Sequence, residues 1–206
     1  GQNLDRVFPG DPNGTVSERI AHAITTEISA QADFLIDLHS SGSFMAMPLL
    51  VGYPLGKNPA ARRAREAARC FGLPVIWGHD GASEGRSLSE PHARGVPWLY
   101  TESPSGGWLH ADVAHRYAEG VRNVMHLLGI LEGAPPRARV EHDLAGEGDV
   151  DRSLAAPVDG FLVNAAELLR SVRQGDLLGT ICDLAGEPIA EIRAPVSGTL
   201  MLRREA

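Results

Sequence analysis

The chain lacks the features that would place it in a membrane or on nucleic acid. No apolar run approaches the roughly 20 residues that a membrane-spanning helix needs, so we expect no membrane partner. Lys57 is the only lysine, and the 206 residues carry a formal net charge of -7. Because phosphate binding needs clustered basic side chains, we expect no nucleic-acid partner either.

Cysteine is also scarce. Cys70 and Cys182 are the only two, they lie far apart, and neither belongs to a C-x-x-C pair. Such cysteines are typical of reduced core residues rather than of a disulfide or a thiolate metal site. We therefore expect the protein to work in a reducing cytoplasm.

The remaining composition is that of an ordinary globular protein, with 43% hydrophobic and 22% charged residues. Short apolar runs predict strands, and stripes with helical spacing predict helices that pack on a sheet. Thr15 and Glu18 form a capping box at the start of the first helix, whose stripe is Val16, Ile20, Ile24 and Ile28. The strands are expected at residues 33–39, 47–51, 74–77 and 96–102, and the helices at residues 16–28, 58–71 and 110–128. This alternation predicts an α/β domain whose mostly parallel sheet is flanked by helices.

The composition changes after this part of the chain. We expect an α/β catalytic domain over residues 1–132, a linker over residues 133–150 that is rich in proline, glycine and charge, and a small all-β domain over residues 151–206. The last part has only short apolar runs separated by glycines, and it contains A-P-V-x-G twice, at Ala156 and at Ala194. The polar stretch 78–95 of the first domain is either a solvated connection or a substrate lid.

Two predicted strands end on residues that can carry chemistry. The apolar run Phe34–Leu38 leads into His39, and a second run ends at Glu102. A histidine and a carboxylate at neighbouring strand ends suit a hydrolytic zinc site, in which imidazole binds the metal and the carboxylate takes a proton from water. Asp37 shares a strand face with His39 and either orients it or is structural. Arg6 offers a clamp for a substrate carboxylate, or is a surface arginine paired with a neighbouring aspartate.

The order of four motifs resembles the succinylglutamate desuccinylase/aspartoacylase family, the deacylase branch of the zinc carboxypeptidase fold. The motifs are N-L-D-R-V-F-P-G-D-P, G-T-V-S-E-R-I-A, D-F-L-I-D-L-H-S-S-G and G-V-P-W-L-Y-T-E-S, and they cover roughly residues 1–130. The resemblance implies that His39 is a zinc ligand and that Glu102 is the general base. It also implies that Arg6 binds the substrate carboxylate or polarises the scissile carbonyl. The implied reaction is hydrolysis of the amide bond of a small N-acyl amino acid.

The chain departs from the family pattern in two places. Asp5 stands where the family usually has asparagine, and as a substrate-binding residue it would disfavour the most acidic substrates and favour cationic ones. The family also takes two further zinc ligands from an H-x-x-E segment upstream of N-L-D-R, and no histidine of this chain has a glutamate three residues later. Because the chain opens on Gly1 without methionine, we expect a fragment that binds zinc poorly and shows no hydrolysis by itself.

Two other functions stay open at this point: a metal-free relative that binds a small molecule or a partner, and a carboxypeptidase that acts on short peptides. The tail resembles the barrel-sandwich fold of biotinyl and lipoyl carrier domains. Those carriers attach their cofactor to a lysine, and this tail has none, which excludes a swinging arm. A lid, a substrate-selecting flap or a contact in a homo-oligomer is left for it.

Overall fold

A computed structural model describes residues 2–104, 108, 110–135, 138–146 and 153–204. These residues fall into two compact units. The first unit takes its described residues from 1–39, 49–102 and 109–147, and the second takes them from 40–48, 103–108 and 148–206. The division therefore differs from the expected one, because residues 40–48 group with the tail.

The first unit is an α/β fold around a five-stranded mixed sheet in the order β1-β5-β3-β4-β6. The strands are β1 (Leu35–Leu38), β3 (Leu50–Pro54), β4 (Val75–His79), β5 (Trp98–Glu102) and β6 (His142–Ala145). Neighbouring strands run parallel except for β3 and β5, which are antiparallel. The expected strand over 47–51 is wrong in its bounds, since β2 (Met45–Ala46) belongs to the second unit and β3 begins only at Leu50.

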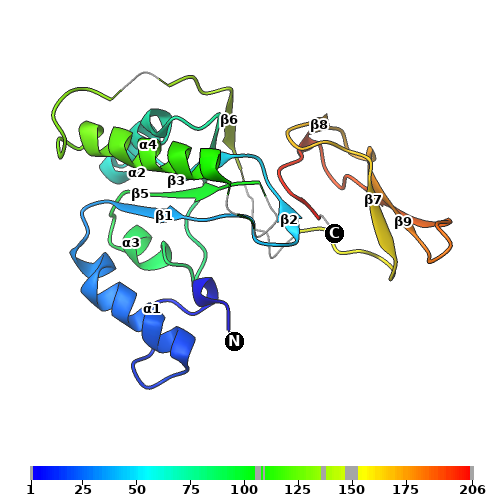
Figure 1. Ribbon diagram of the computed structural model, residues 1–206, viewed down its shortest axis with the longest axis horizontal. Helices are drawn as coiled ribbons and strands as arrows, with labels where there is room; N and C mark the ends of the chain where they lie inside the picture. Colours follow the sequence, from blue (N-terminus) through cyan, green and yellow to red (C-terminus); the bar gives the residue numbers. More distant parts are fainter. Residues whose placement is uncertain (1, 105–107, 109, 136–137, 147–152, 205–206) are drawn as a thin grey trace. The chain divides into compact units, whose positions relative to one another are not determined.

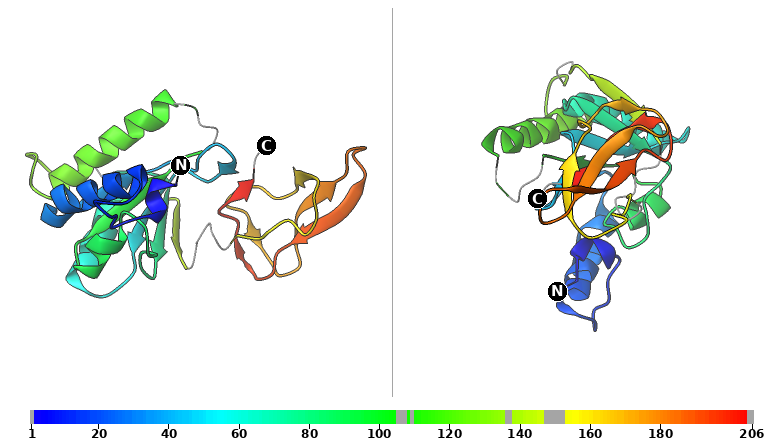
Figure 2. Two further views of the ribbon diagram at one scale, coloured as in Figure 1. Left: turned by 90° about the horizontal axis from the view of Figure 1, so that it is seen from below. Right: turned by 90° about the vertical axis from the view of Figure 1, so that its right-hand side faces the viewer.

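Helices cover both faces of this sheet (Figures 1 and 2). α2 (Pro59–Phe71) and α4 (Ala111–Leu127) lie on one side, and α1 (Val16–Glu27) and α3 (Ser89–Ala93) lie on the other. Two short 3-10 helices, η1 (Leu4–Arg6) and η2 (Ser29–Gln31), flank α1. Ile36 of β1 and Leu99 of β5 pack into the core on the side of α2, so strand alternation directs Glu102 of β5 and His39, which follows β1, to the side of α1, η1 and α3.

Local sequence signals explain where the first two long helices begin and end. The Thr15 hydroxyl accepts from the Glu18 N–H and the Glu18 carboxylate accepts from the Thr15 N–H, which confirms the capping box at α1. Asn58 caps α2 through the Ala61 N–H, and Pro59 occupies the first helical position. Gly72 ends α2 at a φ of 96°, a conformation that favours glycine.

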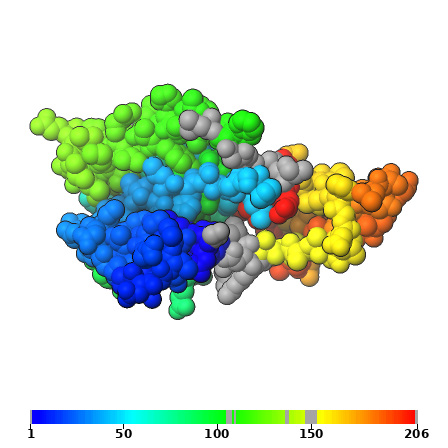
Figure 3. Space-filling view, turned by 60° about the horizontal axis from the view of Figure 1, so that its bottom comes forward, coloured from blue at the N-terminus to red at the C-terminus, as the bar shows by residue number. Residues whose placement is uncertain are grey.

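The packing predicted for α1 is wrong. Val16, Ile20 and Ile28 are 62%, 46% and 60% exposed, so this stripe does not pack on the sheet. The buried residues of α1 are the small Ala21 and Thr25, which allow neighbouring backbone to approach the helix closely. The blue segment that contains α1 lies at the surface of its unit (Figure 3).

The core of the first unit lies between the sheet and the pair α2 and α4. The alanines of α2 let the helix approach the sheet, and larger side chains from the strands fill the remaining space. The fully buried cluster is Val51, Tyr53, Ala64, Ala67, Ala68, Phe71, Leu73, Ile76, Leu99 and Val124. Leu50, Val75 and Trp98, at alternate positions of the strands, are also buried but lie outside this cluster.

The stretch expected to be a linker, residues 133–150, contributes a strand to the first unit. β6 pairs in parallel with β4, and Asp143 of β6 forms ion pairs with Arg65 and Arg69 of α2. The polar, proline-containing sequence of this stretch gives no apolar pattern that would predict a strand. β6 is held instead by its pairing with β4 and by the ion pairs between Asp143 and α2.

The second unit is built from short strands in the part of it that the structure describes. β7 (Phe161–Asn164), β9 (Leu177–Cys182) and β10 (Pro188–Arg193) form an antiparallel sheet in the order β10-β9-β7. β8 (Ser171–Val172) pairs with β11 (Gly198–Thr199), and β12 (Arg203–Arg204) pairs with β2. The two A-P-V-x-G motifs lead into β7 and β11.

None of the helices in the described ranges is long and apolar enough to cross a membrane.

Candidate active site

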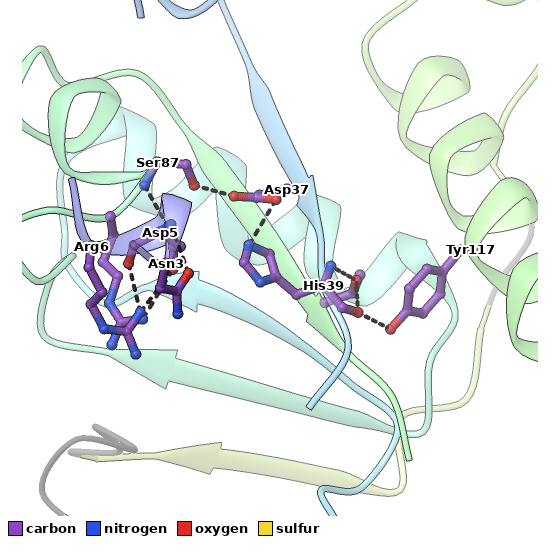
Figure 4. Close-up of polar contacts among 9 residues, drawn as sticks. Asn3, Asp5, Arg6, Asp37, His39, Ser87 and Tyr117 are labelled. Carbon is purple, nitrogen blue, oxygen red and sulfur yellow. Dashed lines mark hydrogen bonds and ion pairs between the residues drawn. The ribbon is translucent and has the colours of Figure 1, made fainter. Parts of the chain in front are cut away.

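The main chain of His39 is held by three hydrogen bonds with two residues at the end of β1. Its N–H donates to Thr101 Oγ1 at 3.1 Å. Its carbonyl accepts from the Tyr117 hydroxyl at 2.9 Å and from the Thr101 hydroxyl at 3.3 Å (Figure 4). Thr101 is fully buried in β5, and Tyr117 comes from α4 on the opposite face of the sheet. The position of His39 is therefore set by a strand and a helix rather than by a flexible loop.

The ring of His39 is oriented by Asp37. His39 Nε2 lies 3.0 Å from Asp37 Oδ1, and the two side chains are only 32% and 24% exposed. The hydrogen bond to Asp37 raises the pKa of His39 to about 9, although burial opposes the shift. Burial alone would raise the pKa of Asp37, but the hydrogen bond to His39 and its charge outweigh burial and lower that pKa. Because Nε2 is engaged, the ring offers Nδ1 to a metal, as metal-ligating histidines do when a carboxylate binds their other nitrogen.

Glu102 ends the neighbouring strand β5. The parallel register that aligns Leu38 with Thr101 places His39 and Glu102 side by side at the carboxyl ends of the two strands. Glu102 Oε2 is buried and has no hydrogen-bond partner within the described residues. Burial raises the pKa of Glu102 to about 7, against the opposing charge of His39. A carboxylate with an unsatisfied oxygen and a pKa near neutrality is suited to accept a proton from water.

Asp5 and Arg6 lie in η1 beside these groups. Asp5 Oδ1 accepts from the Ser87 N–H at 2.9 Å, and Asp5 Oδ2 accepts from Arg86 Nη1 at 3.0 Å. Burial raises the pKa of Asp5, and the hydrogen bond from Ser87 opposes that shift. Arg6 Nη1 donates to the Asp5 carbonyl at 2.6 Å, and the Arg6 side chain is 32% exposed. The structure thus brings all four residues predicted from the sequence to one end of the sheet.

The group that could hold a metal is formed by Asp5, Asp37 and His39. Each offers a ligand atom, and these atoms lie within 4.8 Å of one another. Imidazole nitrogen and carboxylate oxygen are zinc ligands, so the residue types fit this metal. The two aspartates, however, are committed to Ser87, Arg86 and His39. Each oxygen of the two aspartates faces one of these groups, whereas His39 Nδ1 takes part in none of these contacts.

Several residues of this site were not identified from the sequence. Ser87 comes from the polar stretch 78–95, and Thr101 and Tyr117 act through the main chain of His39. Their contacts join positions about 60 to 80 residues apart, and no local pattern signals such pairs. The sequence signal that does exist is the clustering of polar residues in the 78–95 stretch.

A second partly buried histidine, His79, lies farther along the same face of the sheet. His79 Nε2 is 2.7 Å from the Tyr100 hydroxyl, and the Trp77 and His79 rings are 4.6 Å apart. Tyr100 reaches His79 across β3 because Gly52 leaves the space open, where a Cβ would lie 1.8 Å from the Tyr100 ring. Burial lowers the pKa of His79 to about 4 and raises that of Tyr100.

The low pKa of His79 predicts that acid destabilises the folded chain. His79→Gln should make the unfolding free energy less dependent on pH. The His79 pKa is lower in the folded chain than the ordinary 6.5, so acid favours the unfolded chain, and the loss develops as pH falls from 6.5 towards 4. Between pH 7.5 and pH 5.0 the wild type should lose about 2 kcal/mol of unfolding free energy more than the variant. Urea titrations of both proteins at both pH values measure the difference. Equal losses of unfolding free energy in the two proteins would contradict the low pKa of His79.

Comparison with known proteins identifies the family. The succinylglutamate desuccinylase/aspartoacylase catalytic domain matches residues 1–128, which is more than half of the chain. The chain belongs to this family. The resemblance inferred from the four motifs is thereby confirmed, and the α/β fold with a mixed sheet agrees with the solved structures of the family.

The family includes relatives that match this chain along almost its whole length. It is 29% identical over 211 residues to the N-alpha-acetyl-L-2,4-diaminobutyric acid deacetylase of Halomonas elongata, covering 99% of this chain and 61% of the relative. The product-bound structure of the ectoine utilization protein EutE (DoeB) from Ruegeria pomeroyi has a TM-score of 0.86 at 28% identity, over 98% of this chain and 63% of that one. A succinylglutamate desuccinylase/aspartoacylase from Rhodobacter sphaeroides has a TM-score of 0.84 at 26% identity, over 100% and 64%. The chain thus spans somewhat less than two thirds of the length of these family members.

Proposed function

We propose that the gene product carrying this chain is a zinc-dependent hydrolase that cleaves the amide bond of an N-acyl amino acid. The observation that carries the proposal is the pair formed by His39 and Glu102 at neighbouring strand ends. His39 is held by Asp37 with one ring nitrogen left for a metal, and Glu102 has a buried oxygen that finds no hydrogen-bond partner in the part of the chain that the structure describes. The names of the relatives support a deacylase of this family.

Each residue then has a defined task. His39 holds zinc as one ligand of its shell, and the zinc, when bound, polarises the scissile carbonyl and acidifies water. Glu102 accepts a proton from the attacking water and can return it to the leaving amine. Arg6, whose guanidinium is partly exposed in η1, binds the substrate carboxylate. Asp37 keeps the His39 ring in place throughout.

The proposed substrate is an N-acetylated diamino acid such as N-acetyl-2,4-diaminobutyrate. The support is the name of the Halomonas elongata relative, which matches 99% of the chain. The test is a deacylation screen of the gene product, loaded with zinc, against N-acetyl-2,4-diaminobutyrate, N-acetylaspartate and N-succinylglutamate. We expect turnover of the first substrate with the highest kcat/KM, and turnover that is lost on chelation and restored by zinc. No hydrolysis of any N-acyl amino acid would contradict the function, and a preference for another member of the panel would contradict the substrate alone.

The 206 residues by themselves have a second candidate function, which is binding without turnover. It is favoured by the lack of any H-x-x-E in the sequence and by the contacts that already engage both aspartates of the Asp5, Asp37 and His39 group. Catalytic zinc normally has three protein ligands, so this chain alone should hold zinc weakly. Metal analysis after dialysis should find well under one zinc per chain, and one tightly held zinc would contradict this expectation. Calorimetry that detects binding of a product amino acid to this chain would support the second candidate function.

A further inference from the structure

Two loops that are about 80 residues apart in sequence are joined beside the candidate site. The Phe8 N–H donates to the Gly85 carbonyl at 3.0 Å, and the Ser87 N–H donates to Asp5 Oδ1 at 2.9 Å. At Gly85 the chain passes so close to η1 that a Cβ would lie 2.8 Å from the Arg6 carbonyl oxygen, and its φ is +79°. Residues 85–87 are thus fixed against residues 5–8 by one main-chain bond and by the bond from the Ser87 N–H to the Asp5 carboxylate, and the close approach at Gly85 requires glycine.

The Ser87 side chain extends this junction to the metal-binding histidine. Its hydroxyl donates to Asp37 Oδ2, while Asp37 Oδ1 faces His39 Nε2 (Figure 4). Each carboxylate oxygen of Asp37 therefore has a partner of its own. A carboxylate held at one oxygen alone can rotate about its terminal torsion, whose energy wells are broad. The bond from Ser87 fixes the plane of Asp37 and, through it, the orientation of the His39 ring.

The carboxylate of Asp5 is in turn occupied in holding Ser87. One oxygen accepts from Ser87 and the other from Arg86. An asparagine at this position has one acceptor oxygen, and its NH2 group would face one of these two donors. Asp5 and Arg86 consequently form a matched pair. The negative charge of Asp5 faces Arg86, whose Nη1 lies 3.0 Å from Asp5 Oδ2, and also Arg6, whose Nη1 lies 3.5 Å from the same oxygen.

We propose that Ser87 is a positioning residue, which orients His39 through Asp37, and that Asp5 acts through Ser87 rather than on the substrate. The proposal rests on the proposed function, because it gives the orientation of His39 a purpose in metal binding. Outer-shell partners of this kind fix the ring of a ligating histidine, and their loss lowers metal affinity by about 10- to 100-fold. The side chains of Asp5, Ser87 and Asp37 are already in place for this role.

The orientation of His39 can be tested without activity, by NMR of the 206-residue chain labelled with ¹⁵N in histidine. The Nε2–H of His39 should give a slowly exchanging resonance at low field because it is hydrogen-bonded to Asp37. Ser87→Ala should broaden or lose this resonance, and Ser87→Thr, which keeps the hydroxyl, should retain it. Ser89→Ala is the matched control, because Ser89 donates to the Arg86 carbonyl in the same segment and does not touch Asp37. An unchanged His39 resonance in Ser87→Ala would overturn the proposal.

A second measurement links orientation to the metal. In the gene product, Ser87→Ala should weaken zinc binding by about 10- to 100-fold in competition with a chelator, and Ser87→Thr should restore most of the loss. Ser89→Ala should bind zinc like the wild type. Equal affinities of wild type and Ser87→Ala would contradict the proposal even if hydrolysis is found. If no hydrolysis is found but the NMR effect is, the proposed function fails while the positioning role stands.

The role of Asp5 is separated from substrate recognition by Asp5→Asn. This variant removes one acceptor, so we expect a change in the His39 resonance in the direction seen for Ser87→Ala. We also expect a lower kcat, with an unchanged ratio of KM values between N-acetyl-2,4-diaminobutyrate and a neutral N-acetyl amino acid. A change in that ratio together with an unaltered His39 resonance would show instead that Asp5 contacts the substrate.

Discussion

Replacing Glu102 by glutamine should lower kcat of the zinc-loaded gene product by about 10³-fold, because a positioned general base contributes about 10² to 10⁴ in rate. Glutamine has nearly the same shape and fills the same buried space at the end of β5, but it cannot accept the proton. KM should change little, since the substrate carboxylate is assigned to Arg6. Steady-state kinetics with N-acetyl-2,4-diaminobutyrate measure both constants.

The pH profile adds a second signature for the same residue. Burial raises the pKa of Glu102 to about 7, so the base is increasingly protonated below that pH and kcat/KM should fall. A divalent cation bound nearby favours the carboxylate, so the acid limb of the loaded enzyme should lie at or below about pH 7. Glu102→Gln should lack this limb. Glu119→Gln, which alters an exposed residue of α4, is the control and should keep both the rate and the limb. A Glu102→Gln variant with nearly full kcat would remove Glu102 from the mechanism.

Replacing His39 by alanine should have the second large effect, on metal binding. The variant should lose more than about 100-fold in zinc affinity, because changes to mere outer-shell partners already cost up to that much. Hydrolysis should fall to background. It should stay there at the zinc concentration that saturates the wild type. Chelator competition and the deacylation assay measure the two losses.

The control for His39 is His115→Ala, since His115 is exposed on α4. This variant should bind zinc and hydrolyse substrate like the wild type. Circular dichroism and urea unfolding establish that both variants fold, which matters because the main chain of His39 bonds to Thr101 and Tyr117. A folded His39→Ala variant with wild-type zinc affinity would show that the ligand shell lies elsewhere.

Much of the site could be predicted because its residues follow local signals. His39 and Glu102 end apolar strands, and in an α/β sheet the strand ends carry the ligand site. The capping box at Thr15 and the pair Asn58 and Gly72 are read from residue types a few positions apart. The order of the four motifs was sufficient to identify the family, which the match over residues 1–128 confirms.

What could not be predicted depends on contacts between distant segments. The stripe of Val16, Ile20 and Ile28 has helical spacing, yet the spacing does not say whether a partner covers it, and in the described chain these side chains are exposed. β6 was missed because its place in the sheet depends on β4 and on the ion pairs of Asp143 rather than on an apolar run. The role of Ser87 depends on Asp5 and Asp37, 82 and 50 residues away.

The central claim is that His39 binds zinc through Nδ1 while Asp37 holds its Nε2. The most direct measurement is a crystal structure of the zinc-soaked gene product, with anomalous difference maps collected on both sides of the zinc absorption edge. We predict a peak about 2.0 to 2.1 Å from His39 Nδ1, with Asp37 still on Nε2 and Glu102 near the peak but not bonded to it. A fully occupied zinc peak bonded to other residues, with His39 unligated, would contradict the claim.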